Sequence, residues 1–340
     1  MTPMTPTTRL CGWLHRVLAT ATAATALSIF AGTAAAGEIQ FYSSVPRNIS
    51  DALVKAFESA NPGVKVNLYQ AGTEVVLEKI DLEVKSSGRT AADVMWIQEP
   101  AAMARYGKRN LLEPYRPAGA DAIPAVFKDK ENFFTGTAIT FVVLMYNSNM
   151  VSKEQAPKSW KELGDSRFAN QVILANPRVS GTGAALASAM VQLYGWSFWE
   201  KVATTKPVLA AGHPAMISTV IAGERRVAPM QDLSLVEAMK KGQPVSFTVP
   251  SEGALGVGCY VGISKTAKNM PDAKRFVDFL ASNAAAQVLT GVGMYHTSAK
   301  AAPPAGWPRI ADIKLLPFDW DKHDALKPEL KNKFSDLMER

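Results

Sequence analysis

Asn176-Pro-Arg-Val-Ser-Gly-Thr-Gly183 is a polar, glycine-containing stretch that follows an apolar run at residues 172–175. After it, Leu186, Ala189, Met190 and Leu193 recur at i, i+3, i+4 and i+7, the pattern of one helix face. This order predicts a buried strand, a Ser/Gly/Thr loop and the start of a helix.

The loop before this predicted helix has the residue types of an anion site. The first amides of a helix lack partners within it, and the helix dipole adds partial positive charge there. Gly181 and Gly183 would let an oxyanion approach the backbone closely. The hydroxyls of Ser180 and Thr182 can donate to a phosphate, phosphonate or carboxylate, and Arg178 lies close enough to add full charge. The same residue types also form a plain N-cap with Arg178 in solvent, and the segment alone does not distinguish the two.

The N-terminal 36 residues have the pattern of a secretory signal peptide. Basic side chains precede an apolar run at residues 17–31, and small residues at 34–36 offer a cleavage site. A spanning helix would need about 20 apolar residues, and Cys11 lies ahead of the run, where no lipid anchor is expected. We therefore expect cleavage near Ala36 and a periplasmic mature chain that starts at Gly37.

The composition is that of an ordinary globular protein, with 47% hydrophobic and 20% charged residues in a chain of 340, long enough for two domains. The predicted signal peptide carries two arginines and no acidic residue, so its removal lowers the formal charge from +7 to +5. This mild excess favours anionic small ligands only weakly. No basic run is interleaved with aromatic residues, so we expect no nucleic-acid partner. Cys259, the one cysteine of the mature chain, lies in a predicted strand and is interpreted as a structural thiol.

Strands and helices alternate in the first part of the mature chain. Strands are predicted at residues 37–42, 64–69 and 92–96, with helices whose N-caps are Ser50 and Thr73. This order predicts an α/β fold with a parallel sheet and helices on both faces. Ligands bind such sheets at the carboxyl ends of the strands, where we expect Ser43, Ser44, Gly72, Thr73, Glu74, Gln98 and Glu99.

A long apolar strand at residues 138–146 is predicted to cross into a second lobe that repeats the alternation. In that lobe, a strand ends at Gln231 and Asp232, which are further candidate ligand contacts. A strand at residues 254–263 returns to the first lobe. We therefore expect an N-terminal lobe of residues 37–138 plus 254–300, a C-terminal lobe of residues 139–253, and a tail at 301–340, helical from Pro328, that packs on the body.

A series of short motifs occurs in a characteristic order along the mature chain. It resembles the periplasmic substrate-binding proteins of bacterial ABC importers, of the extracellular solute-binding protein family 1 type. More narrowly, it is similar to the family that holds ferric-ion-binding proteins and their organophosphate- and phosphonate-binding relatives. The motifs are Tyr42-Ser-Ser44, Asn61-Pro-Gly63, Ala92-Asp-Val94, Leu111-Leu-Glu-Pro114, Ser180-Gly-Thr-Gly183, Ala222-Gly-Glu224, Ala267-Lys-Asn269 and Ala273-Lys-Arg-Phe-Val-Asp-Phe-Leu280.

The resemblance covers nearly the whole mature chain and implies a two-lobed periplasmic-binding-protein fold of class II, with a double-crossover hinge. A ligand would be held between the lobes, and closure would present it to an ABC permease in the inner membrane. The expected protein is a monomer with no cofactor and no enzymatic activity.

The ferric-ion ligands of the resembling family have no counterpart in this sequence. The family's histidine falls at Pro46, its glutamate at Gln98, and its tyrosine pair at Leu233 and Ser234. Ferric iron needs anionic oxygen donors. The resemblance therefore implies a metal-free site for an organophosphate or a phosphonate such as 2-aminoethylphosphonate, with a ferric-ion-binding protein as the alternative.

Three glutamates bear on whether the ligand carries an amine. Glu74 and Glu99 are predicted in the first turns of helices, where the dipole alone favours a carboxylate, and Glu252 has the same ambiguity. If either of the first two points inward, it would pair with an ammonium and the ligand would be a zwitterion.

A periplasmic hydrolase and a sensory partner of a membrane kinase are the competing functions. The Ser180 loop lacks the G-x-S-x-G pattern, and no nucleophile–base pair is visible in the sequence. A sensory partner would use the same closure and differ only in the surface that reads it.

Overall fold

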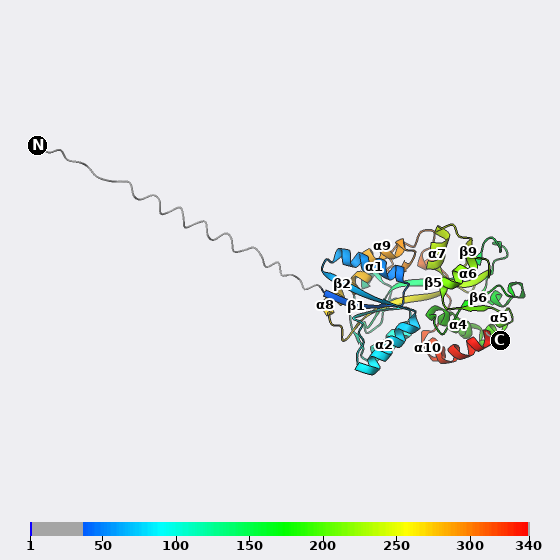
Figure 1. The fold of residues 1–340 in the computed structure, drawn as a ribbon, viewed down its shortest axis with the longest axis horizontal. Helices are drawn as coiled ribbons and strands as arrows, with labels where there is room; N and C mark the ends of the chain where they lie inside the picture. The colour runs from blue at the N-terminus through cyan, green and yellow to red at the C-terminus, as the bar shows by residue number, and fades with distance from the viewer. Residues whose placement is uncertain (2–36, 339–340) are drawn as a thin grey trace. The chain divides into compact units, whose positions relative to one another are not determined.

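A sheet of nine strands runs through the described part of the chain, residues 37–338 together with Met1, in this computed structural model (Figure 1). Its main path has the order β11-β5-β10-β3-β1-β2. Of the other three strands, β4 pairs with β10, and β8 and β9 pair with β5. The predicted signal peptide lies outside the described residues.

The first three strands pair in parallel, as predicted, and each is followed by a helix. Two helices begin differently from the prediction. Ser50 lies buried inside α1, where its hydroxyl donates to the Val45 carbonyl, because the helix already starts after Pro46. Thr73 is the first residue of α2 rather than its N-cap, which is Gly72. The elements are β1 (Gly37–Ser43), α1 (Arg47–Ala60), β2 (Val64–Gln70), α2 (Thr73–Ser87), β3 (Val94–Ile97) and α3 (Pro100–Lys108).

Two long strands, β5 (Thr135–Asn147) and β10 (Leu255–Ser264), run antiparallel along the middle of the sheet. β10 pairs with β3 and β4 (Leu112–Glu113), while β5 pairs with β11 (Tyr295–His296), β8 (Val227–Gln231) and β9 (Val245–Thr248). All these pairs are antiparallel, so the parallel arrangement predicted from the alternation holds only for β1, β2 and β3 within this sheet. β5 and β10 correspond to the two strands that the sequence predicts to cross between the lobes. The lobe boundaries at residues 138 and 254 remain a prediction.

A second, two-stranded parallel sheet is formed by segments that lie between β5 and β10 in the sequence. Its first strand directly precedes the segment of residues 176–183. Helix α4 begins at Gly181, three residues before the predicted start at Ala184, so the Gly-Thr-Gly segment is its first turn. The elements are β6 (Ile173–Ala175), α4 (Gly181–Tyr194), α5 (Trp196–Ala203), β7 (Val208–Ala210), α6 (His213–Ile221) and α7 (Asp232–Lys240).

The C-terminal part of the chain is mainly helical, and its last long helix differs from the prediction. α8 (Met270–Leu280) and α9 (Asn283–Gly291) are separate helices, because Ser282 caps a new start. The tail helix α10 (Trp320–Glu329) begins eight residues ahead of Pro328, which lies inside it. A proline removes a helix hydrogen bond, and here the helix widens into a π-helical segment, Leu330–Phe334, before α11 (Ser335–Met338). Short 3₁₀ helices occur at Ala120–Ala122, Ala125–Phe127, Trp160–Gly164, Ser166–Phe168 and Ile310–Asp312.

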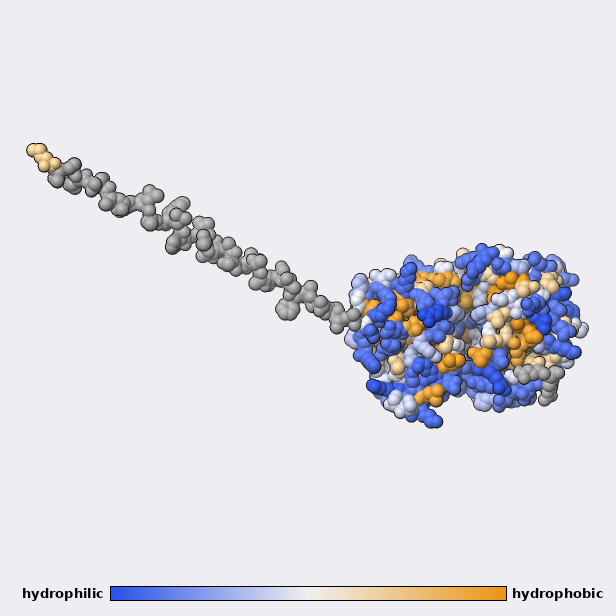
Figure 2. Space-filling view, in the orientation of Figure 1, coloured by the Kyte–Doolittle hydropathy of each residue, from blue (hydrophilic) through white to orange (hydrophobic). Residues whose placement is uncertain are grey.

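Several separate hydrophobic clusters form the core. Two consist mainly of residues around β1, β2, β3 and β10, and two of residues around β5, β6, β8 and α4. The tail belongs to one of the latter pair, because Leu330, Phe334 and Met338 pack in the same cluster as Trp199. On the face drawn in Figure 2, hydrophilic side chains surround small separate hydrophobic patches. Within residues 37–338, no helix is long and apolar enough to cross a membrane.

Candidate functional site

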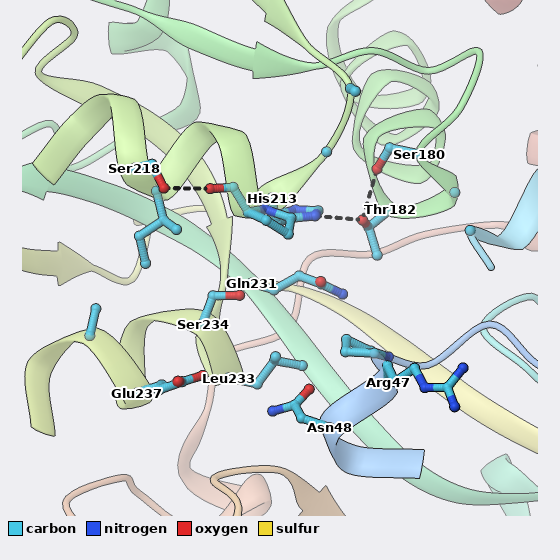
Figure 3. Close-up of a pocket in the computed structure, with 18 of the residues that line it drawn as sticks. Arg47, Asn48, Ser180, Thr182, His213, Ser218, Gln231, Leu233, Ser234 and Glu237 are labelled. Atoms are coloured by element: carbon cyan, nitrogen blue, oxygen red, sulfur yellow. Dashed lines mark hydrogen bonds between the residues drawn. The ribbon is translucent and has the colours of Figure 1, made fainter. Parts of the chain in front are cut away.

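A cavity of about 960 Å³ lies where the starts of α1, α2, α4, α6 and α7 converge (Figure 3). α1, α2 and α4 contribute only their first residues or the residues just before them, so their N-terminal partial positive charge faces the cavity, whereas α6 and α7 line it along their length. Eight of the predicted site residues line it: Ser44, Gly72, Thr73, Gln98, Ser180, Gly181, Thr182 and Gln231.

The first turn of α4 presents both hydroxyls and free amides. The Gly183 amide donates to Ser180 Oγ at 3.1 Å, so Ser180 is the N-cap and Gly183 is not available to a ligand. The Thr182 hydroxyl lies 3.3 Å from Ser180 Oγ and 3.5 Å from His213 Nδ1. The amides of Gly181 and Thr182 have no acceptor among the described residues. These two amides are therefore the part of this turn that can bind an anion.

The starts of α2 and α4 touch at one edge of the cavity. A Cβ atom built on Gly181 would lie 2.7 Å from Thr73 Cβ and 2.7 Å from Thr73 Oγ1. One built on Gly72 would lie 3.0 Å from the Val179 carbonyl oxygen. Glycine at these positions lets two helix starts from distant parts of the sequence approach the same ligand.

Two buried glutamines line the cavity from the ends of strands. Gln98 follows β3 and Gln231 ends β8, and each side chain is almost fully buried. The Nε2 atoms of both lack a hydrogen-bond acceptor within residues 37–338. A buried donor without an acceptor costs about 1–3 kcal/mol, so a ligand oxygen that accepts from either amide would remove this cost.

Charged side chains are few around the cavity, and most of them are paired. Glu237 accepts from Lys241 at 2.7 Å, and Arg47, near the entrance, pairs with Asp51 at 3.3 Å. The described residues contain no cluster of three or more histidine, cysteine or carboxylate side chains that could hold a metal ion. Neutral polar groups and helix amides therefore dominate the site.

Several lining residues were missed by the sequence reasoning. His213 begins α6, and burial lowers its pKa to about 4, so the ring is neutral at physiological pH. The signal that could have found it was Gly212-His213-Pro214 at a helix start, but β7 before it has only three residues. The other polar lining residues that were missed are Arg47, Asn48, Gln70, Ser218, Ser234, Glu237, Lys241 and Gln243.

Six predicted site residues do not line the cavity: Ser43, Glu74, Glu99, Arg178, Gly183 and Asp232. The Ser43 hydroxyl lies 2.9 Å from that of Ser50 in the core. Arg178 donates to the Lys331 carbonyl at 2.7 Å and so contacts the tail. Asp232 is buried behind the start of α7, where its carboxylate accepts from Thr140 and from the Leu233 amide. Burial raises the pKa of Asp232 to about 7.

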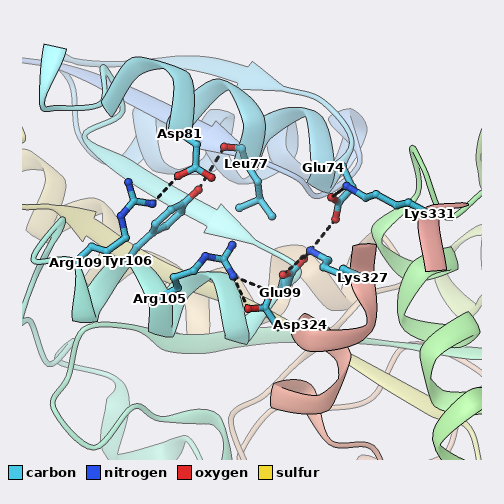
Figure 4. Close-up of polar contacts among 10 residues, drawn as sticks. All are labelled: Glu74, Leu77, Asp81, Glu99, Arg105, Tyr106, Arg109, Asp324, Lys327 and Lys331. Atoms are coloured by element: carbon cyan, nitrogen blue, oxygen red, sulfur yellow. Dashed lines mark hydrogen bonds and ion pairs between the residues drawn. The ribbon is translucent and has the colours of Figure 1, made fainter. Parts of the chain in front are cut away.

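Glu74 and Glu99 do meet ammonium groups, but these belong to the chain itself (Figure 4). Lys327 Nζ lies 2.6 Å from Glu99 Oε2 and 2.9 Å from Glu74 Oε1, and Lys331 Nζ lies 2.6 Å from Glu74 Oε2. Glu252 is also engaged elsewhere, since it accepts from Ser159 at 2.6 Å and from Tyr194 at 2.7 Å.

Comparison with known sequences identifies the family. Residues 90–325 match the sequence model of the bacterial extracellular solute-binding protein family. The chain belongs to this family. As a solute-binding protein, it is a component of an ABC importer and binds a ligand rather than catalysing a reaction. The members of its family are periplasmic. Its partners are accordingly a small ligand and a membrane permease.

Relatives of this solute-binding protein carry different ligands in their names. Iron uptake protein A1 of Synechocystis is 26% identical over 316 residues, which cover 86% of this chain and 84% of the relative. A periplasmic protein of Salmonella paratyphi A, provisionally named for 2-aminoethylphosphonate binding, is 24% identical over 248 residues, 69% of this chain and 68% of the relative. The periplasmic binding protein AfuA of Actinobacillus pleuropneumoniae, solved with fructose-6-phosphate, has a TM-score of 0.77 at 24% identity and covers 89% of this chain and 99% of its own. This structural likeness confirms the two-lobed fold, whereas the names leave the ligand open.

Proposed function

We propose that this solute-binding protein captures a small organic phosphate or phosphonate without a metal ion and delivers it to its permease. The observation that carries the proposal is the start of α4, where the amides of Gly181 and Thr182 face a cavity that other helix N-termini also face. Such a site favours an oxyanion through both hydrogen bonds and the helix dipoles.

The donor set of the cavity argues against ferric iron as the ligand. Ferric iron is a hard cation that needs anionic oxygen ligands. Glu237 is the carboxylate that lines the cavity, and its charge is already paired with Lys241. The iron-named relatives would still indicate the ligand if it were an iron–citrate complex. The carboxylates of citrate could accept hydrogen bonds from the helix amides.

The body of the ligand is best matched by hydroxyl groups rather than an amine. Glu74 and Glu99, the two predicted partners of a ligand ammonium, bind Lys327 and Lys331 instead, and Glu237, which lines the cavity, pairs with Lys241. Gln98, Gln231 and His213 supply neutral hydrogen-bonding groups to the cavity. The cavity, of about 960 Å³, has room for a sugar phosphate.

The mechanism follows from the two sets of contacts. An oxyanion on α4 and a polar body that reaches Ser44, Thr73 and Gln98 would contact both predicted lobes at once. Because only a closed arrangement makes both sets of contacts, the ligand shifts the population toward it. The permease then receives the closed, liganded form.

Calorimetric titration of the ligand-stripped chain tests this proposal. The titrants are a hexose phosphate, 2-aminoethylphosphonate, inorganic phosphate and ferric citrate, each with and without EDTA. We expect tight binding of the hexose phosphate that is unchanged by EDTA. Binding of ferric citrate alone would overturn the proposal, and tighter binding of 2-aminoethylphosphonate would overturn the choice of a hydroxylated ligand.

We also propose that the mature protein starts at Gly37 and is monomeric. The first follows from the signal-peptide pattern before residue 37. Mass spectrometry of the periplasmic form should give the mass of residues 37–340, and light scattering should give that of a single chain.

A further inference from the structure

The C-terminal tail has one face buried in the core. Leu330, Phe334 and Met338 belong to the hydrophobic cluster that contains α4 and α5. The ring of Phe334 packs edge-on against Trp199, with centroids 4.7 Å apart. At the other end of the tail, Gln192 on α4 donates to the Asp319 carbonyl at 2.9 Å. The tail is therefore attached along its length to the α4 and α5 side.

The opposite face of the same tail carries charges that reach α2 and the start of α3. Lys327 lies between Glu99 and Glu74, and only 11% of its side chain is exposed. Lys331 adds a second contact to Glu74. Arg105 on α3 donates two hydrogen bonds to the Asp324 carboxylate, at 2.7 and 2.8 Å (Figure 4).

These ion pairs lie directly beside the ligand cavity. Glu74 follows Thr73, and Glu99 follows Gln98, and both preceding residues line the cavity. The tail thus holds the same two segments that would contact the ligand from the N-terminal side.

The buried charges make these contacts costly to break. Burial disfavours the charged form of Lys327, but Glu99 and Glu74 outweigh it and hold the pKa of Lys327 above its ordinary value. Burial also disfavours the charged form of Glu74, but Lys327 and Lys331 outweigh it and lower the pKa of Glu74. A buried ion that loses its partner is strongly destabilising, so separating the tail from α2 and α3 requires these groups to be rehydrated together.

We propose that residues 320–338 are a clasp that fastens α2 and α3 to the α4 and α5 side at one edge of the cleft. The clasp is a third connection between the predicted lobes, in addition to β5 and β10. It restricts how far this edge opens in the absence of ligand, and it thereby raises the affinity of the site. The effect on affinity rests on the proposed function, whereas the effect on lobe separation does not.

Distance measurements between spin labels test the clasp directly. Cysteines replace Ser86 at the exposed end of α2 and Ser197 on α5, and the buried native Cys259 should stay unlabelled. The variants, in the chain from Gly37, combine Lys327→Gln with Lys331→Gln. Lys322→Gln is the matched control, because this lysine is on the same helix but is 71% exposed and pairs only with nearby Asp319.

We expect a narrow distance distribution in the unsubstituted and control proteins and a broader, longer one in the double variant. Ligand affinity should fall about three- to tenfold in the double variant, because open states compete with the binding-competent one. An unchanged distribution would overturn the proposal. Broader distances with tighter binding would also overturn it, because the clasp would then oppose closure.

A milder variant keeps the test decisive if the double variant folds poorly. Asp324→Asn removes the Arg105 pair, whose side chains are each 36% exposed, and leaves the buried Lys327 cluster intact. It should broaden the same distribution to a smaller extent, and no broadening would count against the clasp. If no titrant binds to any variant, the proposed function fails, but the distances of the ligand-free chain still decide whether the clasp exists.

Discussion

Gly181→Ala should weaken ligand binding. The added Cβ would lie 2.7 Å from Thr73, compared with 3.4–4 Å for ordinary contact, so α2 and α4 would have to separate by about 1 Å. A hydrogen bond lengthened by this amount leaves the range of useful geometry. Loss of one bond to a charged ligand group costs about 1.5–3 kcal/mol, which corresponds to about a ten- to one-hundredfold rise in Kd.

The same substitution has two opposing effects on the free energy of unfolding. Gly181 is the first residue of α4 and has no positive φ. Alanine is favoured over glycine in helices by about 0.5–1 kcal/mol, whereas relieving the contact with Thr73 costs about 1–3 kcal/mol, so thermal denaturation has to be measured beside binding.

Calorimetry on Gly181→Ala and on a matched control gives the answer. Gly291→Ala is the control, because Gly291 also lies in a helix but a Cβ there would meet nothing within 4 Å. We expect the control to bind as the unsubstituted protein does. If Gly181→Ala binds within twofold of the unsubstituted protein, the contact between Thr73 and Gly181 does not limit closure and the reasoning is refuted.

Three further substitutions test other parts of the structure. Ser180→Ala combined with Thr182→Ala should cost about 1–3 kcal/mol of binding, and unchanged affinity by calorimetry would show that neither hydroxyl contacts the ligand. Burial raises the pKa of Asp232 to about 7, so the folded state binds this proton more tightly than the unfolded state, and the stabilisation is lost as pH rises through 7. Relative to the unsubstituted protein, Asp232→Asn should therefore gain stability as the pH rises from about 4 to about 7, by up to about 4 kcal/mol in total; a pH-independent difference in denaturation midpoints would contradict this. Phe334→Ala should cost about 3–5 kcal/mol of unfolding free energy, because it empties a buried position that anchors the tail, and a loss below about 1 kcal/mol in denaturant titration would show that the tail is not anchored there.

Local sequence patterns predicted most strands and helices but misplaced several helix starts. Ser50 and Thr73 are good N-cap residues, yet Pro46 and Gly72 occupy those positions. The reason is tertiary: Ser50 satisfies its hydroxyl within the core, and Thr73 packs against α4. Pro328 was interpreted as a helix start because proline is favoured there, but packing of Leu330 and Phe334 extends the helix across it.

Residues that line the cavity could be predicted where they stand at the end of a strand or the start of a helix. The surroundings of a residue could not be predicted where they depend on segments far away in the sequence. Ser44, Gln98 and Gln231 line the cavity because polar residues at strand ends face the ligand edge of the sheet. Glu99 does not, because its partner Lys327 is 228 positions away and no local pattern reveals that pairing. Antiparallel pairing of β10 with β3 is equally non-local.

The position of β10 has a consequence for the order in which the chain can fold. β3 lies between β1 and β10 in the sheet, but β10 is made only after all of β5 to β9. During synthesis, residues 37–108 therefore emerge with one side of β3 unpaired and part of their core missing. An open strand edge is a template for aggregation, so the nascent N-terminal segment must be kept soluble until residue 264 has emerged.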